Sequence, residues 1–128
     1  MGIKETYEKI SAAVVNGTLP EVTHHFADDF VLVEPDVLPY GGSFHGPQGF
    51  VELTKKIRES YNVEVISAVS TEAGDELLII EYVFDFESKR TGEHVEAACV
   101  DLFRWSKDGK LLRCDIYYKD PDKLASIA

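Results

Sequence analysis

Two acidic residues lie in strand-like segments that are otherwise apolar. Glu34 ends the segment Phe30–Glu34, and Asp101 lies in the middle of the segment Ala97–Phe103. Two carboxyl groups in one apolar cavity can divide acid and base work, because burial raises the pKa of one, which stays protonated and donates, while the other stays ionised and takes a proton. Such chemistry needs no metal and no cofactor, and we expect neither.

Each acid also has a simpler interpretation. Glu34 could be a solvent-exposed acid at a strand end, or an ion-pair partner of Arg58 or Lys55. Asp101 could pair with a cation from a neighbouring strand or from another subunit, since a buried charge needs a partner.

The other residues that often do chemistry give weaker signals. His24 and His25 are adjacent, which is not the spacing of metal ligands, and His45 lies in a glycine-rich loop where histidines are usually solvated. Cys99 and Cys114 lie in apolar segments without a metal-binding pattern, so we expect reduced core thiols.

Length and charge restrict the function further. The 128 residues fit one domain, residues 1–128, and 45% apolar with 28% charged residues is typical of a globular protein. A formal charge of −10 argues against nucleic acid and anionic membranes as partners. No apolar run approaches the roughly 20 residues of a membrane helix, and the N-terminus lacks a secretory signal, so we expect a cytoplasmic protein that binds a small apolar or carbonyl-containing ligand.

Helical periodicity dominates the first half of the chain. Apolar residues at steps of three and four predict a helix from residue 3 to about 16, and a capping-box pattern at Thr18 and Glu21 predicts a short helix that buries Leu19, Val22 and Phe26. A strand ends at Glu34. The Pro- and Gly-rich segment 36–46 is predicted as a loop, long enough to be a lid, before a third helix that begins at Pro47.

The second half of the chain has the pattern of four consecutive strands, which predicts an antiparallel β-meander. Strands are predicted at 63–73, 77–87, 94–105 and 110–118, with a short helix after Pro121, so the fold class is α+β. The two middle strands are apolar on both faces. Helices can cover one face, and we expect a second copy of the chain to cover the other, giving a homodimer through the outer face of the sheet.

The sequence is compatible with two pairing registers for the last hairpin. A loop of two or four residues would place Asp101 opposite Cys114, whereas a three-residue loop with Gly109 in a bulge would place it opposite Asp115. We favour the first, because it keeps Cys114, Ile116 and Tyr118 on the side of the presumed pocket.

Several motifs together resemble one superfamily. They are Phe26-Ala27-Asp28-Asp29, the acid directly before Pro35, the glycine-rich stretch 39–46 that opens a helix, and residues 100–105 before a Gly-Lys turn. The chain resembles the nuclear transport factor two-like superfamily, particularly its ketosteroid isomerase-like and SnoaL-like members, over nearly its whole length. The resemblance implies a cone-shaped fold, in which a curved antiparallel sheet wraps around three N-terminal helices and encloses an apolar pocket.

The ketosteroid isomerase pattern implies roles for both acids. Glu34 falls at the position of the catalytic base, and Asp101 at that of the protonated acid of the oxyanion hole. The family's third group, a tyrosine on the first helix, aligns with Ile10 here, so Tyr7, Tyr82 or Tyr118 would have to supply the missing hydroxyl. The Arg-x-Asp pattern of the superfamily's epoxide hydrolases is absent from Glu81–Phe84.

The resemblance also implies a set of ligand contacts and a choice of functions. The expected substrate-binding side chains are Tyr7, Ile10, Tyr82, Phe103, Ile116 and Tyr118. An isomerase or polyketide cyclase that moves a proton alpha to a carbonyl would fit. The alternative is a noncatalytic ligand-binding or dimerisation domain of the same fold, and a third hypothesis is an interaction module that works through the outer sheet face.

Overall fold

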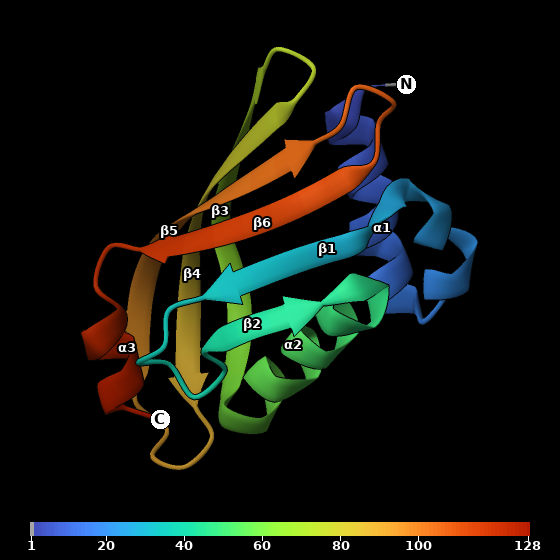
Figure 1. Ribbon diagram of the computed structural model, residues 1–128. Helices are drawn as coiled ribbons and strands as arrows, with labels where there is room; N and C mark the ends of the chain where they lie inside the picture. The colour runs from blue at the N-terminus through green and yellow to red at the C-terminus, as the bar shows by residue number, and fades with distance from the viewer. Residues whose placement is uncertain (1) are drawn as a thin grey trace.

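A computed structural model describes residues 2–128 (Figure 1). It contains a mixed six-stranded sheet, with strand order β2-β1-β6-β5-β4-β3, and three α-helices. The predicted α+β class is therefore confirmed. The elements are α1 (Ile3–Asn16), β1 (Phe26–Glu34), β2 (Gly42–His45), α2 (Gly46–Ser60), β3 (Tyr61–Ala73), β4 (Leu77–Ser88), β5 (His94–Trp105), β6 (Leu111–Tyr118) and α3 (Pro121–Ser126).

The predicted first and third helices are confirmed as α1 and α2. Helix α1 buries Ile3, Ile10 and Ala13 on one stripe and ends at Gly17, whose left-handed backbone (φ 74°) lets its N–H bond to the carbonyl of Ala13. Pro47 lies in the first turn of α2, where its missing N–H costs no helical hydrogen bond.

The second predicted helix is wrong. The segment instead forms two short 3₁₀ turns, η1 (Leu19–Glu21) and η2 (Thr23–His25), and the Thr18 side chain makes no capping hydrogen bond. Without that cap, the first backbone N–H groups of an α-helix here would lack a side-chain acceptor, and the chain enters β1 at Phe26. Leu19, Val22 and Phe26 are nevertheless all buried, as predicted.

The sheet confirms the antiparallel meander β3-β4-β5-β6 but is not wholly antiparallel. β1 pairs with β6 in parallel, which the long connection through α2 and the meander permits, so the prediction of an antiparallel sheet is wrong. β2, which pairs with β1, lies within the segment predicted as a loop. With only four residues, one of them glycine, β2 has little β-strand signal in the sequence.

Neither register considered for the last hairpin is correct. Asp101 pairs with Ile116, because a five-residue turn precedes β6 and Leu112 forms a bulge between the pairs Trp105–Leu111 and Arg104–Arg113. The observed register differs from the favoured one by two residues. Because side chains alternate along a strand, each side chain of β6 stays on the predicted face of the sheet. Ile116 remains on the face of Asp101, and Asp115 on the opposite face, where it pairs with Arg113 at 2.9 Å.

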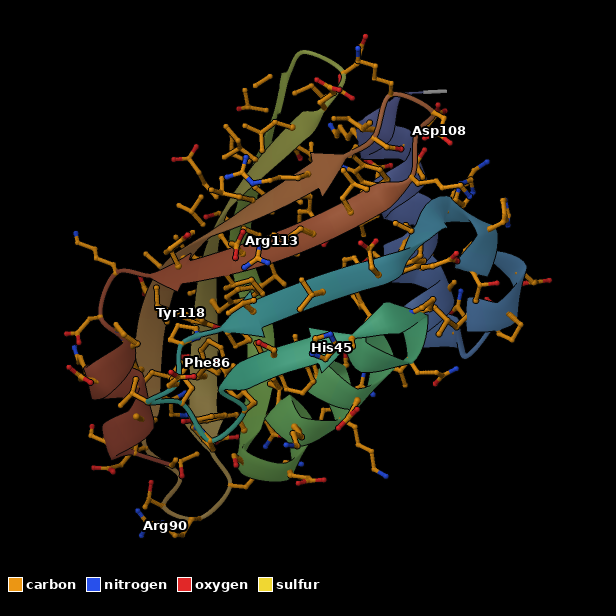
Figure 2. All side chains as sticks on the ribbon, in the orientation of Figure 1. His45, Phe86, Arg90, Asp108, Arg113 and Tyr118 are labelled. Atoms are coloured by element: carbon orange, nitrogen blue, oxygen red, sulfur yellow. The ribbon has the colours of Figure 1, made fainter. Side chains whose placement is uncertain are left out.

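The sheet is strongly curved, with β3 and β4 behind β1, β2 and β6 in the view of Figure 1. Helix α2 packs against β1, β2 and β3, and α1 against β3 and β4, so both helices lie on the same side of the sheet. Figure 2 shows Arg90 in the turn after β4 and Asp108 in the turn after β5, at opposite ends of the sheet. None of the helices in residues 2–128 is long and apolar enough to cross a membrane.

Candidate active site

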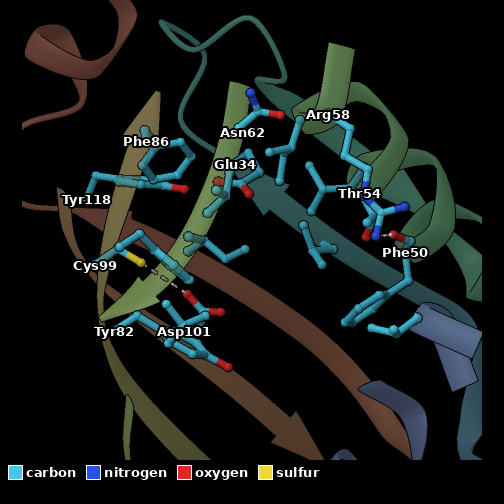
Figure 3. A pocket seen from close by; sticks show the side chains of 18 of the residues that line it. Glu34, Phe50, Thr54, Arg58, Asn62, Tyr82, Phe86, Cys99, Asp101 and Tyr118 are labelled. Atoms are coloured by element: carbon cyan, nitrogen blue, oxygen red, sulfur yellow. Dashed lines mark hydrogen bonds between the residues drawn. The ribbon is translucent and has the colours of Figure 1, made fainter. Parts of the chain in front are cut away.

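A cavity of about 650 Å³ lies between the inner face of the sheet and the helices (Figure 3). This volume is in the range of sites that bind small organic molecules. Most of its wall is apolar. Five elements, β1, α2, β4, β5 and β6, contribute the large apolar side chains Leu32, Phe50, Leu53, Ile57, Phe84, Phe86, Phe103 and Ile116. Both acids singled out in the sequence, Glu34 and Asp101, also line it.

Five of the six expected substrate contacts line the same cavity. They are Tyr7, Tyr82, Phe103, Ile116 and Tyr118. Ile10, the sixth, is fully buried in the core and is not among the lining side chains. The hydroxyl-bearing residue of α1 that reaches the cavity is therefore Tyr7, one helical turn before Ile10.

Glu34 is buried at the end of β1. Alternation along the strand puts it on the same inward face as Phe30 and Leu32, so its side chain is only 3% exposed. Its Oε1 atom has no hydrogen-bond partner within residues 2–128. Burial, with a further contribution from the charge of Asp101, raises the pKa of Glu34 from 4.5 to about 9, so this carboxyl is protonated at neutral pH.

Asp101 faces the cavity from the middle of β5. It is buried between Cys99 and Phe103 on the inward face of the strand, and its Oδ1 accepts a hydrogen bond from the Cys99 Sγ at 3.8 Å. Burial raises the pKa of Asp101 from 3.8 to about 7, while the Cys99 contact lowers it slightly. Of the two acids, Asp101 therefore loses its proton first.

Neither acid takes part in an ion pair with the residues that the structure describes. The interpretations of Glu34 as the partner of Arg58 or Lys55, and of Asp101 as the partner of a strand cation, thus find no support within the chain. Both carboxyls are free to interact with a molecule in the cavity.

Each acid lies beside a pair of tyrosines. Near Asp101, the hydroxyls of Tyr7 and Tyr82 are 3.0 Å apart, and the aspartate charge contributes to the raised pKa of both. Near Glu34, the hydroxyls of Tyr40 and Tyr118 are 2.8 Å apart, and the glutamate charge acts on both in the same way. The cavity therefore offers hydroxyl groups at two places, one beside each carboxyl.

Sequence reasoning missed several contributors to this site. Tyr40 lies in the segment predicted as a loop and was not among the expected site residues, yet its hydroxyl is hydrogen-bonded to that of Tyr118. Phe84 and Phe86 line the cavity and could have been found from alternation with Tyr82 along β4.

The described part of the chain contains no group of three or more His, Cys, Asp or Glu side chains arranged to hold a metal ion. The chemistry available from the residues themselves is proton transfer and hydrogen bonding to a ligand inside an apolar cavity.

Comparison with known proteins agrees with this architecture. The family model described as SnoaL-like domain matches residues 7–114. An NTF2-like protein from Burkholderia xenovorans has a similar structure, with a TM-score of 0.82 and 18% identity, over 96% of this chain and 94% of that chain. No curated protein matches this chain significantly.

Two further structures carry functional names. A protein from Pseudomonas putida provisionally named a polyketide cyclase has a TM-score of 0.72 and 18% identity, over 100% of this chain and 99% of that chain. A provisionally named isomerase from Bacillus subtilis has a TM-score of 0.62 and 17% identity, over 90% and 84%. At these identities the likeness establishes the fold alone.

Proposed function

Because this chain belongs to the SnoaL-like domain family and has the NTF2-like fold, we propose that it is a cofactor-independent isomerase or cyclase that moves a proton alpha to a carbonyl group. The curved sheet and the helices would form a cone around the ligand. The observation that carries the proposal is the pair of buried, unpaired carboxyls, Glu34 and Asp101, in one cavity. The provisional names of two distant relatives, a polyketide cyclase and an isomerase, agree with this class of reaction.

We assign the base to Asp101 and the acid to Glu34, which reverses the roles that the family resemblance implies. With a pKa of about 7, Asp101 is about half ionised at neutral pH, whereas Glu34, with a pKa of about 9, stays protonated. The Oε1 of Glu34 has no partner among the described side chains, so a protonated Glu34 can donate its hydrogen bond to a ligand.

In the proposed reaction, Asp101 removes a proton from the carbon next to the carbonyl, and the C–H electron pair moves into the new C=C bond of the enolate. The enolate oxygen accepts a hydrogen bond from Glu34 as its charge develops. In an isomerisation, Asp101 then returns the proton to another carbon of the same ligand. In an aldol-type cyclisation, the enolate carbon instead attacks a second carbonyl, whose oxygen takes the proton.

The tyrosine pair beside Asp101 supports the same assignment. The family's tyrosine position on the first helix holds Ile10, but Tyr7 reaches the cavity from one turn earlier and bonds to Tyr82. We propose that this pair orients the base Asp101 beside the carbon from which the proton is removed.

Exchange of hydrogen for deuterium tests the proposal. In heavy water, the protein should introduce deuterium next to the carbonyl of a cyclic ketone, and NMR would follow the loss of the proton signal. Saturable binding without any exchange would instead favour the second candidate, a noncatalytic ligand-binding domain, which the same cavity would also serve.

We also propose that a second copy of the chain covers the outer face of the sheet. This face carries half-buried Val83 and Val100 together with exposed Tyr117, an apolar surface that the helices leave uncovered. Glu81 and Lys119 lie on the same surface, so a twofold axis can bring opposite charges together. A homodimer is the simplest assembly that satisfies both features.

A further inference from the structure

The acidic side chains of the cavity are buried, and its basic side chains are exposed. Glu34 and Asp101 are 3% and 9% exposed, whereas Arg58 and Lys89, which line the same cavity, are exposed. Exposed Val63 also lines it, at 41%. The two cations therefore belong to the mouth of the cavity, and the two acids to its interior.

Arg58 is placed at the mouth by helical periodicity. The cavity face of α2 carries Phe50, Thr54 and Arg58 at steps of four residues, and Figure 3 shows all three on the same side of the helix. Lys55 and Lys56 belong to the same helix but do not line the cavity, and Lys56 lies over the ring of Phe44 at 5.6 Å. Of the three cations Lys55, Lys56 and Arg58, only Arg58 lines the cavity.

Lys89 comes from outside α2, and its backbone is hydrogen-bonded to the end of that helix. It follows β4, and its backbone N–H donates to the carbonyl of Ser60, two residues after Arg58, at 2.9 Å. A cation near the end of a helix interacts favourably with the helix dipole, which alone would explain Arg58. It does not explain Lys89, which is outside the helix and lines the same cavity.

Neither cation has an acidic partner. Within residues 2–128, no ion pair involves Arg58 or Lys89, although the chain has ten more acidic than basic residues. The other polar group of the mouth, Asn62, already donates to Glu87 at 3.1 Å. Two unpaired cations at one opening, in so acidic a chain, are complementary to an anionic group on the ligand.

We propose that the natural ligand is an apolar ring compound that carries a carboxylate, which lies between Arg58 and Lys89 while its ketone reaches Glu34 and Asp101. The position of the ketone rests on the proposed function, but the position of the carboxylate rests only on the two cations. The mouth then selects the substrate, and it orients the ring so that the carbonyl end enters first.

Binding of two matched ligands tests this inference. We would titrate the protein with the ketone 6-carboxy-1-tetralone and with its carboxamide, which has nearly the same shape and no charge, and measure both Kd values by calorimetry. Wild type should bind the acid about tenfold more tightly than the amide, and the preference should shrink in high salt. Arg58→Ala combined with Lys89→Ala should abolish the preference, whereas Lys55→Ala, an exposed change on the same helix, should retain it.

The outcomes separate this inference from the proposed function. Equal affinity for the two compounds, a preference that survives the double change, or binding of neither compound would overturn the carboxylate assignment, even if other ketones undergo exchange. A preference that depends on Arg58 and Lys89 would support it, even if no deuterium exchange occurs and the catalytic proposal fails.

Discussion

Glu34 and Asp101 lie level with each other on either side of β6. Asp101 pairs directly with Ile116 in the antiparallel ladder of β5 and β6. In the parallel ladder of β1 and β6, Val33, the residue before Glu34, pairs with Asp115, the residue before Ile116, so both acids lie at the level of Ile116. Neighbouring strands are about 4.8 Å apart, which separates the two backbones by roughly 10 Å. Side chains that extend from both into one cavity can therefore bracket a ligand between them.

The pH dependence of exchange should be bell-shaped. The proposed active form has an ionised Asp101, with a pKa of about 7, and a protonated Glu34, with a pKa of about 9. Between pH 5 and 10, kcat/KM should rise with an apparent pKa near 7 and fall with an apparent pKa near 9. Both apparent pKa values belong to the coupled pair of acids. The alkaline limb should disappear in Glu34→Gln. A rate that keeps rising through pH 10 in the wild type would rule out an acid of this kind.

Removal of one hydroxyl from the tyrosine pair should slow exchange. Tyr7→Phe breaks the 3.0 Å contact with Tyr82 beside Asp101, and we expect a loss of roughly tenfold to a hundredfold in kcat. Tyr61→Phe is the matched control, because the Tyr61 hydroxyl donates to the carbonyl of Leu124 and Tyr61 is not among the side chains that line the cavity. Equal rates for wild type and Tyr7→Phe would show that the pair only packs.

The stability of the fold should fall as the pH rises, because of Glu34. Below its ordinary pKa of 4.5 the carboxyl is protonated whether the chain is folded or not, and between 4.5 and about 9 only the folded chain keeps the proton. Unfolding then releases a proton, which lowers the unfolding free energy by up to about 1.4 kcal/mol per pH unit for each such group.

Glu34→Gln removes the contribution of Glu34 and leaves that of Asp101, so the variant should be more stable than wild type at pH 8 and similar to it at pH 4. Thermal unfolding at the two pH values would measure the difference, with the exposed Glu52→Gln as control. A difference of the same size at both pH values would mean that ionisation of Glu34 is not the cause.

A charge on the outer face of the sheet should separate the proposed dimer. Val100 lies half-buried on this face, away from the ligand cavity, and Val100→Lys would place like charges against each other across a twofold axis. Sedimentation should show a dimer for wild type and a monomer for the variant. A wild-type monomer at all concentrations would refute the assembly.

The sequence predicted those elements whose signals are local. The helical spacing of Ile3, Ile10 and Ala13 and the alternation of strands β4 and β5 are recorded in the residues themselves. The parallel pairing of β1 with β6 is not, because it joins segments about 80 residues apart and depends on how the whole sheet folds.

The site was foreseen to the same extent. An acid inside an apolar strand is visible in the sequence, and so both carboxyls were found. The order of their pKa values depends on burial and on the charge of one acid acting on the other, and both are determined only in the assembled cavity. The five-residue turn and the Leu112 bulge each shift the register by one residue, so Asp101 lies opposite Ile116 and not Cys114, and no local residue pattern predicts this shift.

The assignment of base and acid is tested most directly by deuterium exchange into a cyclic ketone at pH 8, with Asp101→Asn and Glu34→Gln compared with wild type. An amide cannot act as the base but can still donate a hydrogen bond. Asp101→Asn should therefore lose on the order of a hundredfold to ten-thousandfold in rate, and Glu34→Gln much less. The opposite order of losses, or full activity in both variants, would contradict the proposed division of roles.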